Sequence, residues 1–300
     1  MSEEIDELEK IISSKNEDAF ISFTLNHSND QLVQLRTDYQ SKFSRDFLKD
    51  LESNFSGNFL DVMTGLYKTL AEYEADLLYK AMKGLGSDKD IISEVLSFNT
   101  PERINEIKMK FQEKYWKDFV EELKSETSGD YQKIILHLLE GKRNINPSPN
   151  IENCTKIAKE IYDAGEGKLG TNEDIFINYI TSLSKEELLY VCKEYHRNYK
   201  KIMLDVIESE FSSNVKDLLK FILYSIFSPS EFFAIQIHNS IVGLGTSDSK
   251  LIRTIISRAD IDMKRIKKYY KKLYNKDMVE EVKDDISGTY QKIIEGLINK

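Results

Sequence analysis

The feature that most restricts how this chain can fold is a glycine loop paired with a distant acidic residue, repeated at one spacing. Residues 82–88 read MKGLGSD, and Glu126 follows Gly86 by 40 positions. Gly170 and Glu210 have the same separation, as do Gly245 and Asp285. One glycine loop is weak evidence of function. Three loop–acid pairs in the same register indicate a repeated structural unit with an ion site in each copy.

The residue types at these positions favour calcium. Calcium takes about six to eight oxygen ligands at about 2.3–2.6 Å, and main-chain carbonyls and bidentate carboxylates are common donors. Glycine tolerates the backbone angles that turn carbonyls toward one point. Three carbonyls and one carboxylate supply about five ligands, which leaves room for water or an external phosphate oxygen. In the alternative interpretation, Gly84 and Gly86 end one helix and Ser87 begins the next. The threefold recurrence favours the ion site.

Composition limits the possible partners. The 300 residues are 40% hydrophobic and 31% charged, as in an ordinary globular protein, and the formal net charge is −9. This charge argues against binding nucleic acid or anionic lipid through bulk electrostatics, so attachment to an acidic surface requires a bridging cation. The four histidines are scattered and fit no nucleophile or metalloprotease motif. We therefore expect neither an enzyme nor a small-molecule substrate.

The expected location is the cytoplasm. No stretch of about 18 apolar residues is present, so no membrane-spanning helix is expected. The first residues, MSEEID, lack the basic and apolar regions of a signal peptide. The two cysteines, Cys154 and Cys192, have no partner at metal-binding spacing and are expected to be free thiols in a reducing compartment.

Further columns of residues keep the same offsets and extend the repeat to four units. The columns are Tyr39, Phe111, Tyr195 and Tyr270; then Leu35, Ile107, Val191 and Ile266, four positions earlier; then Val62, Ile134, Leu218 and Ile293 near the end of each unit. A spacing of four places residues on one face of a helix, so these columns predict helices packed on a core. The first unit has Ile12, Ser14 and Asn54 at the loop and acid positions, which predicts the fold without the site.

Helix-start signals and prolines give the unit boundaries. Capping boxes are predicted at Ser87 with Asp90, at Thr127 with Asp130 and at Ser184 with Glu187. Pro101, Pro147, Pro149 and Pro229 all lie at predicted boundaries. We predict an all-α chain of four repeats, with boundaries at 1–69, 70–147, 148–228 and 229–300.

Over essentially its whole length, the chain resembles the annexin family. The resemblance rests on residues 82–88 with 126–130 (ETSGD), on 164–171 (AGEGKLGT) and on 251–262 (LIRTIISRADID), which is similar to that family's last-repeat signature. It implies four annexin-type repeats of about five helices each, arranged as a curved disc. The short N-terminal segment is similar to that of the annexin-like alpha-giardins of some protists.

The resemblance also implies ligands and a function. Calcium would be held by main-chain oxygens and one acid in each of three repeats: Met82, Gly84 and Gly86 with Glu126; Gly165, Lys168 and Gly170 with Glu210; Ile241, Gly243 and Gly245 with Asp285. The function implied is calcium-dependent binding to anionic phospholipid membranes, with the protein peripheral on the inner face of a membrane when calcium rises. We expect Leu85, Leu169 and Leu244 at the loop tips to enter the lipid interface.

A scaffold protein is the alternative that the sequence leaves open. Such a protein would bind cytoskeletal filaments or acidic glycans, with calcium as a secondary factor. The basic runs 264–268 and 271–272 would serve a partner of that kind. Basic runs are more often a solvated helix face, and this is the interpretation that we favour here.

Overall fold

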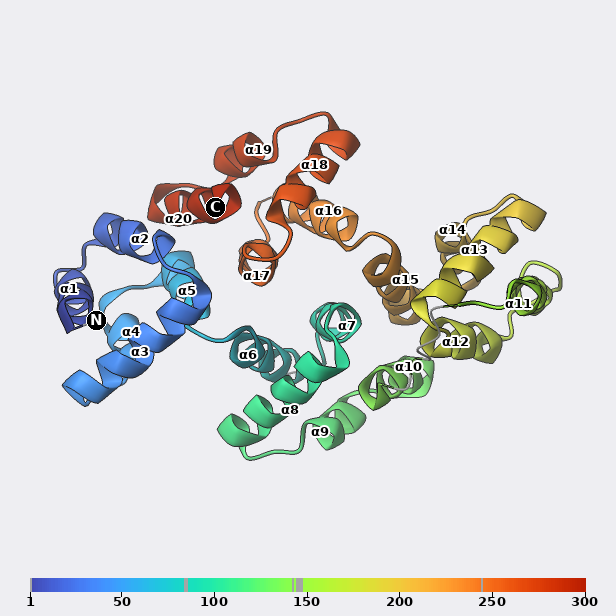
Figure 1. The fold of residues 1–300 in the computed structure, drawn as a ribbon, viewed down its shortest axis with the longest axis horizontal. Coiled ribbons are helices and arrows are strands. Elements are labelled where there is room, and N and C mark those ends of the chain that lie inside the picture. Colours follow the sequence, from blue (N-terminus) through green and yellow to red (C-terminus); the bar gives the residue numbers. More distant parts are fainter. Residues whose placement is uncertain (1, 84–85, 142, 144–147, 244) are drawn as a thin grey trace. The chain divides into compact units, whose positions relative to one another are not determined.

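The structure is a computed structural model that describes residues 2–83, 86–141, 143, 148–243 and 245–300 (Figure 1). Within these residues it contains α-helices and no strand, which confirms the all-α prediction. The predicted linker residues 144–147, including Pro147, lie outside the described residues. No helix in the described part of the chain is both long and apolar enough to cross a membrane.

The described residues form four successive groups of five helices. The first group is α1 (Ser2–Ser13), α2 (Glu17–Leu25), α3 (Asn29–Phe43), α4 (Phe47–Asn54) and α5 (Gly57–Leu66). The second is α6 (Leu70–Met82), α7 (Lys89–Phe98), α8 (Pro101–Tyr115), α9 (Phe119–Glu126) and α10 (Gly129–Glu140). The third is α11 (Ile151–Ala164), α12 (Glu173–Ser182), α13 (Lys185–Tyr199), α14 (Met203–Glu210) and α15 (Ser213–Phe227). The fourth is α16 (Pro229–Ile241), α17 (Asp248–Arg258), α18 (Met263–Tyr274), α19 (Met278–Asp285) and α20 (Gly288–Asn299).

Local sequence signals explain many helix ends. The capping box at Ser184 and Glu187 is confirmed at the start of α13, and Thr100 caps α8 ahead of Pro101. The third helix of each group ends in a residue with left-handed backbone angles, which turns the chain into the short fourth helix. These residues are Ser44, Trp116, Lys200 and Asn275.

Two predicted caps were wrong. Asp88, not Ser87, caps α7, and its side chain accepts a hydrogen bond from the Ile91 amide at 3.2 Å. Ser128, not Thr127, precedes α10, because the Thr127 hydroxyl donates to the Leu123 carbonyl of the preceding helix at 2.5 Å.

The predicted columns form the core. Tyr39, Phe111, Tyr195 and Tyr270 have no exposed surface, and their neighbours four positions earlier are also buried. The column near the end of each group is likewise buried. Because the same helix faces are apolar in every group, each group packs its five helices around an equivalent centre.

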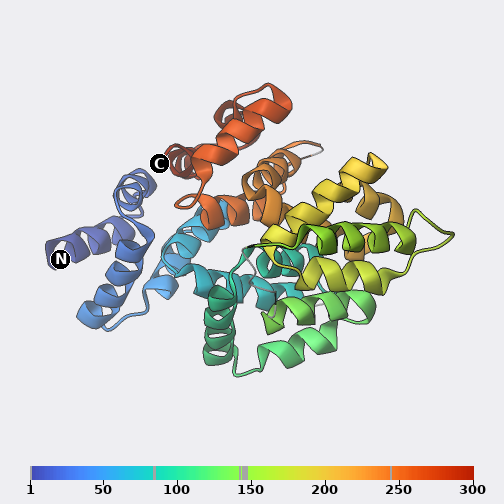
Figure 2. The same ribbon diagram turned by 45° about the vertical axis from the view of Figure 1, so that its right-hand side comes forward.

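The chain divides into two compact units. One contains residues up to Tyr73 together with Ser230–Lys300, and the other contains Glu74–Pro229. In the first unit, α2 and α20 lie side by side although they come from opposite ends of the sequence (Figures 1 and 2). Lys292 of α20 pairs with Asp18 of α2 at 2.6 Å, and Thr289 donates to Glu17. Gly296 allows the close approach, because a β-carbon there would lie 2.3 Å from the Leu25 side chain.

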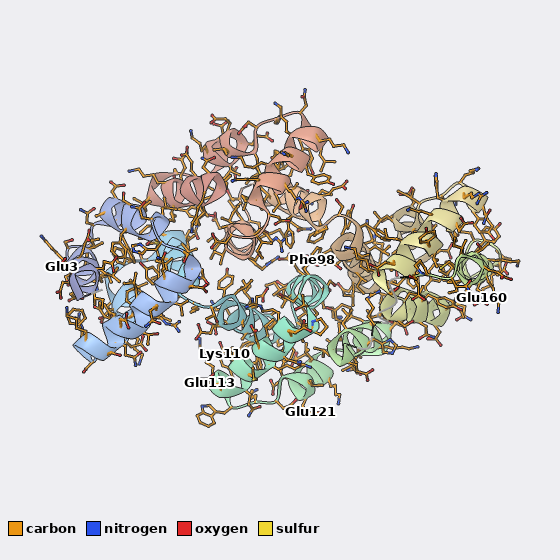
Figure 3. All side chains as sticks on the ribbon, in the orientation of Figure 1. Glu3, Phe98, Lys110, Glu113, Glu121 and Glu160 are labelled. Atoms are coloured by element: carbon orange, nitrogen blue, oxygen red, sulfur yellow. The ribbon has the colours of Figure 1, made fainter. Side chains whose placement is uncertain are left out.

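In the second unit, α7 packs against α15 and α10 packs against α12, so helices of the second and third groups share one core. Long charged side chains project from its helices, among them Lys110 and Glu113 on α8 and Glu121 on α9 (Figure 3). Both cysteines, Cys154 and Cys192, are unpaired, as predicted.

Candidate metal sites in three loops

The three predicted loops connect the first two helices of the second, third and fourth groups, and their described residues share two backbone features. In each loop a hydrogen bond closes the base: the Asp88 amide donates to Ala81, the Asn172 amide to Ala164 and the Ser247 amide to Ser240, at 2.7–2.8 Å. The last loop glycine has a positive φ in all three: +92° at Gly86, +80° at Gly170 and +89° at Gly245. Other residues rarely adopt this conformation, so glycine is required there.

The structure brings each loop to its predicted acid. The hydroxyl that follows the last glycine donates to the main-chain oxygen of the acidic residue at the end of the fourth helix. The three pairs are Ser87 with Glu126 at 3.3 Å, Thr171 with Glu210 at 3.5 Å and Thr246 with Asp285 at 3.3 Å. In all three groups, a loop and an acid that are about 40 positions apart in the sequence are therefore in direct contact in the structure.

The side-chain carboxylates of Glu210 and Asp285 also accept a hydrogen bond from the loop hydroxyl. Thr171 Oγ1 donates to Glu210 Oε2 at 2.6 Å, and Thr246 Oγ1 donates to Asp285 Oδ2. A β-carbon at Gly165 would lie 3.0 Å from the Glu210 carboxyl group. Glycine at position 165 thus lets the loop backbone approach the carboxylate directly.

The second-group site opens onto a hollow of about 470 Å³ lined by Gly86, Ser87, Asp88, Lys89, Asp90, Glu126 and Asn214. Of these lining residues, the sequence predicts only Gly86 and Glu126 as ligands. Asp90 is predicted there only as a capping residue, Lys89 has no predicted role, and Asn214 comes from α15 of the third group. Burial raises the pKa of nearby Asp217, and the negative charge of Asp90 raises it further. The hollow is therefore a polar and acidic surface built from two groups of helices.

In each of these groups, an aromatic ring on the helix that leads into the loop stacks on a ring of the third helix. Tyr79 stacks on Tyr115 with ring centroids 3.7 Å apart, and Tyr162 stacks on Tyr199 at 3.9 Å. In the fourth group, His238 replaces the first tyrosine and stacks on Tyr274 at 3.6 Å. Burial lowers the pKa of His238.

In the third loop, Glu166 accepts hydrogen bonds from Tyr195 at 2.9 Å and from Lys201. Burial and this hydrogen bond raise the pKa of Tyr195, which keeps its phenol protonated as a donor. Both carboxylate oxygens of Glu166 therefore form contacts that hold the third loop in place.

The first group lacks these features. The Asn54 side-chain amide donates to Asp50 of its own helix at 2.8 Å, and Ser14 bonds Ile11 at 3.0 Å. Ile12, at the position of the first loop glycine, is buried. The loss of the site in the first repeat stays a prediction.

The other predicted ligands lie along the loops. Met82 and Ile241 are the buried last residues of α6 and α16, Gly243 has φ of +129°, and Lys168 is exposed. Gly84 lies outside the described residues. Among the described residues, no hydrogen bond joins the acids to Met82, Lys168, Ile241 or Gly243. The assignment of these carbonyls as ligands stays a prediction.

The donors fit a hard cation. Among the described residues, no group of three or more histidine, cysteine, aspartate or glutamate side chains could hold a metal. A metal in these loops would therefore depend on main-chain oxygens together with one carboxylate, and oxygen donors of this kind suit calcium.

Comparisons with known proteins give one result across the chain. The model of the Annexin family matches residues 6–66, 73–138, 156–222 and 232–297. Human annexin A4 is 36% identical over 279 residues, covering 93% of this chain and 88% of that protein. A calcium-bound structure of annexin (Sm)1 aligns with a TM-score of 0.86 at 26% identity, covering 100% of this chain and 90% of that one.

The expected likeness to giardins also appears. A calcium-bound structure of alpha-14 giardin aligns with a TM-score of 0.83, covering 98% of this chain and 99% of that one. Its identity of 19% supports a shared fold and no more.

Proposed function

The chain belongs to the annexin family, whose members bind calcium and, through it, membranes, and on this premise we propose that it binds anionic phospholipid through its three loops. The observation that carries the proposal is the contact repeated between each loop and its acid. Glu126, Glu210 and Asp285 each lie at the end of a short helix, directly beside a glycine loop. The first repeat lacks this arrangement and is given no role in binding.

Each of the three loops supplies an incomplete set of oxygens. The loop carbonyls and one carboxylate together provide about five donors, fewer than calcium prefers. Calcium bound there would bridge the loop oxygens and a lipid phosphate. The exposed positions of Gly86, Gly170 and Gly245 leave one side of each loop open to a headgroup.

Two consequences follow from this arrangement. Lipid should raise calcium affinity, and by linkage calcium must raise lipid affinity by the same factor. Sites that engage one surface from one chain should also make binding steep in calcium concentration.

Vesicle co-sedimentation against calcium concentration tests the proposal. The wild-type protein is expected to sediment with vesicles of phosphatidylserine and phosphatidylcholine once calcium is added at physiological salt, and to be released by a chelator. A scaffold protein of the alternative kind would sediment with filaments or bind heparin whether or not vesicles were present. Absence of calcium-dependent sedimentation would contradict the proposed function.

A second prediction concerns the tip of the third loop. Leu169 is fully exposed, so the folded chain gains nothing from this apolar side chain in water. Burying a leucine contributes about 1.5–3 kcal/mol at most, and partial insertion into lipid contributes less. Leu169→Ser is therefore expected to weaken vesicle binding by about two- to tenfold while calcium binding in solution changes little. The two other tip leucines, Leu85 and Leu244, lie outside the described residues.

Ile151→Ser is the matched control for Leu169→Ser. Ile151 is 57% exposed, and it begins the helix whose other end leads into the third loop. The Ile151→Ser variant should leave vesicle affinity unchanged. If both variants behave like the wild type, the loop tip does not enter the lipid.

Location and activity are part of the same proposal. A peripheral protein of this kind would be cytoplasmic and reach the inner face of a membrane when calcium rises. Annexins are generally not enzymes, and we propose no catalytic activity for this chain.

A further inference from the structure

The third helix of the fourth group, α18, differs in charge from its three counterparts. It carries six basic residues and no acidic one: Lys264, Arg265, Lys267, Lys268, Lys271 and Lys272. The equivalent helices are balanced: α3 has two basic and two acidic residues, α8 has four and three, and α13 has three and three. Because the four helices occupy the same place in the repeat, the fold itself does not require this charge.

The basic residues of α18 also lack the partners that such residues have elsewhere. On α8, Lys110 pairs with Glu113 at 3.0 Å, both labelled in Figure 3, and Lys114 pairs with Asp76 at 2.6 Å. In the described part of the chain, no ion pair involves any of the six α18 residues. Lys267 donates to the neutral Asn299 at 2.9 Å, and Lys272 lies over the Tyr269 ring, 5.9 Å from its centroid, so neither contact neutralises the charge. The charge of α18 is therefore left for solvent or for a partner.

These residues form one face, which we call the basic face of α18. Met263, Ile266 and Tyr270 are buried on the opposite side of the helix. At about 100° per residue, the six cations cover an arc of about 160°, and the row from Lys264 to Lys272 extends about 12 Å. The four lysines at 264, 268, 271 and 272 are all exposed.

The net charge of −9 does not cancel this face. At physiological ionic strength the Debye length is about 8 Å, so an anionic surface that touches α18 experiences the nearby lysines more strongly than distant carboxylates. The charge of the basic face, and not the net charge of the whole chain, therefore determines the attraction between α18 and a surface that touches it. A polybasic helix of this size is typical of contacts with acidic lipid headgroups.

We propose that the basic face of α18 is a contact site for anionic lipid surfaces that operates without calcium. Lipid is favoured over other polyanions by an exposed apolar residue at the start of the face. Ile261, just before α18, is 59% exposed. Apolar side chains beside a basic row gain from a lipid interface.

The direction of α18 separates this contact from docking through the loops. The helix runs beside α16 and in the same sense, because Ser230 bonds Asp262 near both starts and His238 meets Tyr270 and Tyr274 near both ends. The C-terminal end of α16 leads into the glycine loop of the fourth group. Lys271 and Lys272 therefore lie at the loop end, and Lys264 lies about 12 Å further away along the axis. A flat membrane touching the whole face would lie along the axis of α18 and would not depend on the loops.

The test uses the whole chain in a chelator at low salt, with vesicles of four parts phosphatidylcholine to one part phosphatidylserine. The wild type is expected to sediment with these vesicles and to be released as salt is raised. A variant in which Lys264, Lys268, Lys271 and Lys272 are changed to Gln should lose at least about tenfold in vesicle affinity, because each lysine near an anionic surface contributes to binding. Circular dichroism checks that the variant is folded.

A matched variant removes the same charge from exposed lysines elsewhere: Lys49, Lys156, Lys185 and Lys193. It should lose less than about twofold, because scattered lysines do not act together on one surface. In calcium at physiological salt, the α18 variant should still sediment with these vesicles through its loops. This arm separates the basic face from the loop sites, whose failure would appear only in calcium.

Four results would overturn the proposal. The wild type would fail to sediment in chelator at low salt, or the α18 variant would sediment as well as the wild type. Equal losses in the two lysine variants would show that total charge matters and the basic face does not. Binding to heparin or RNA without binding to these vesicles would likewise assign the face to another polyanion.

Discussion

Changing Glu126 and Glu210 to Gln and Asp285 to Asn together is expected to abolish calcium-dependent vesicle binding and to leave the helical content unchanged. Each change removes the proposed anionic ligand of one loop while preserving its size. Each single variant should raise the calcium midpoint by roughly tenfold or less, since ligand charge tunes calcium affinity over several decades. The combined variant loses the charged ligand at every proposed site.

The folded state should tolerate these three changes. In the described part of the chain, none of the three acids forms an ion pair, and each lies at a half-exposed or exposed helix end. The amide oxygen of Gln or Asn still accepts the hydrogen bonds from Thr171 and Thr246. Stability should therefore change by less than about 1 kcal/mol per site.

Vesicle co-sedimentation across a calcium series measures the effect, and far-ultraviolet circular dichroism monitors the fold. Asn54→Gln is the matched control, because Asn54 occupies the acid position of the first repeat, where its amide bonds its own helix. This control should behave like the wild type. A folded triple variant that still sediments with acidic vesicles in calcium would show that the three acids are not the ligands.

The sequence predicted the structure best at positions where the same residue types recur from repeat to repeat. The column of Tyr39, Phe111, Tyr195 and Tyr270 was predicted to face a core, and all four side chains are buried. The loop–acid register also predicted which segments would meet, because a fixed separation within a repeated unit leads to the same contact each time. The hydrogen bonds from Ser87, Thr171 and Thr246 are that contact.

Capping residues were less predictable, because neighbouring polar residues compete for one role. Ser87 and Asp88 are adjacent, and both can cap a helix. The Ser87 hydroxyl bonds the Glu126 carbonyl, 39 positions away, which leaves Asp88 to cap α7. A local motif carries no information about that distant acceptor.

Tertiary partners between repeats were beyond the sequence for a similar reason. The repeat pattern does not say that α20 packs on α2, which depends on contacts such as Lys292 with Asp18. It also does not place Asn214 in the wall of the second-group hollow. Residues that vary between repeats were therefore located only by the structure.

Phe111→Ala is expected to destabilise the unit formed by residues 74–229 by about 3–5 kcal/mol, the usual cost of removing a buried aromatic ring from a core. Phe111 has no exposed surface. Its ring centroid lies 5.2 Å from that of Tyr115, 5.1 Å from that of Phe119 and 6.0 Å from that of Tyr79. Truncation leaves a cavity among three rings held by other contacts, so the site cannot collapse to fill it. Urea unfolding followed by circular dichroism measures the loss.

Phe111→Leu is the control that separates a cavity from a general disturbance, because leucine keeps most of the apolar volume. It should cost less than half as much as alanine. The alanine variant should also show a higher calcium midpoint for vesicle binding in conditions where it is still folded, since Phe111 contacts Tyr115 and also Tyr79, which lies on the helix that leads into the second loop. Equal stability losses for alanine and leucine would show that the loss reflects the absence of an aromatic ring and not of volume. An unchanged calcium midpoint in the folded alanine variant would show that the core and the second loop act independently.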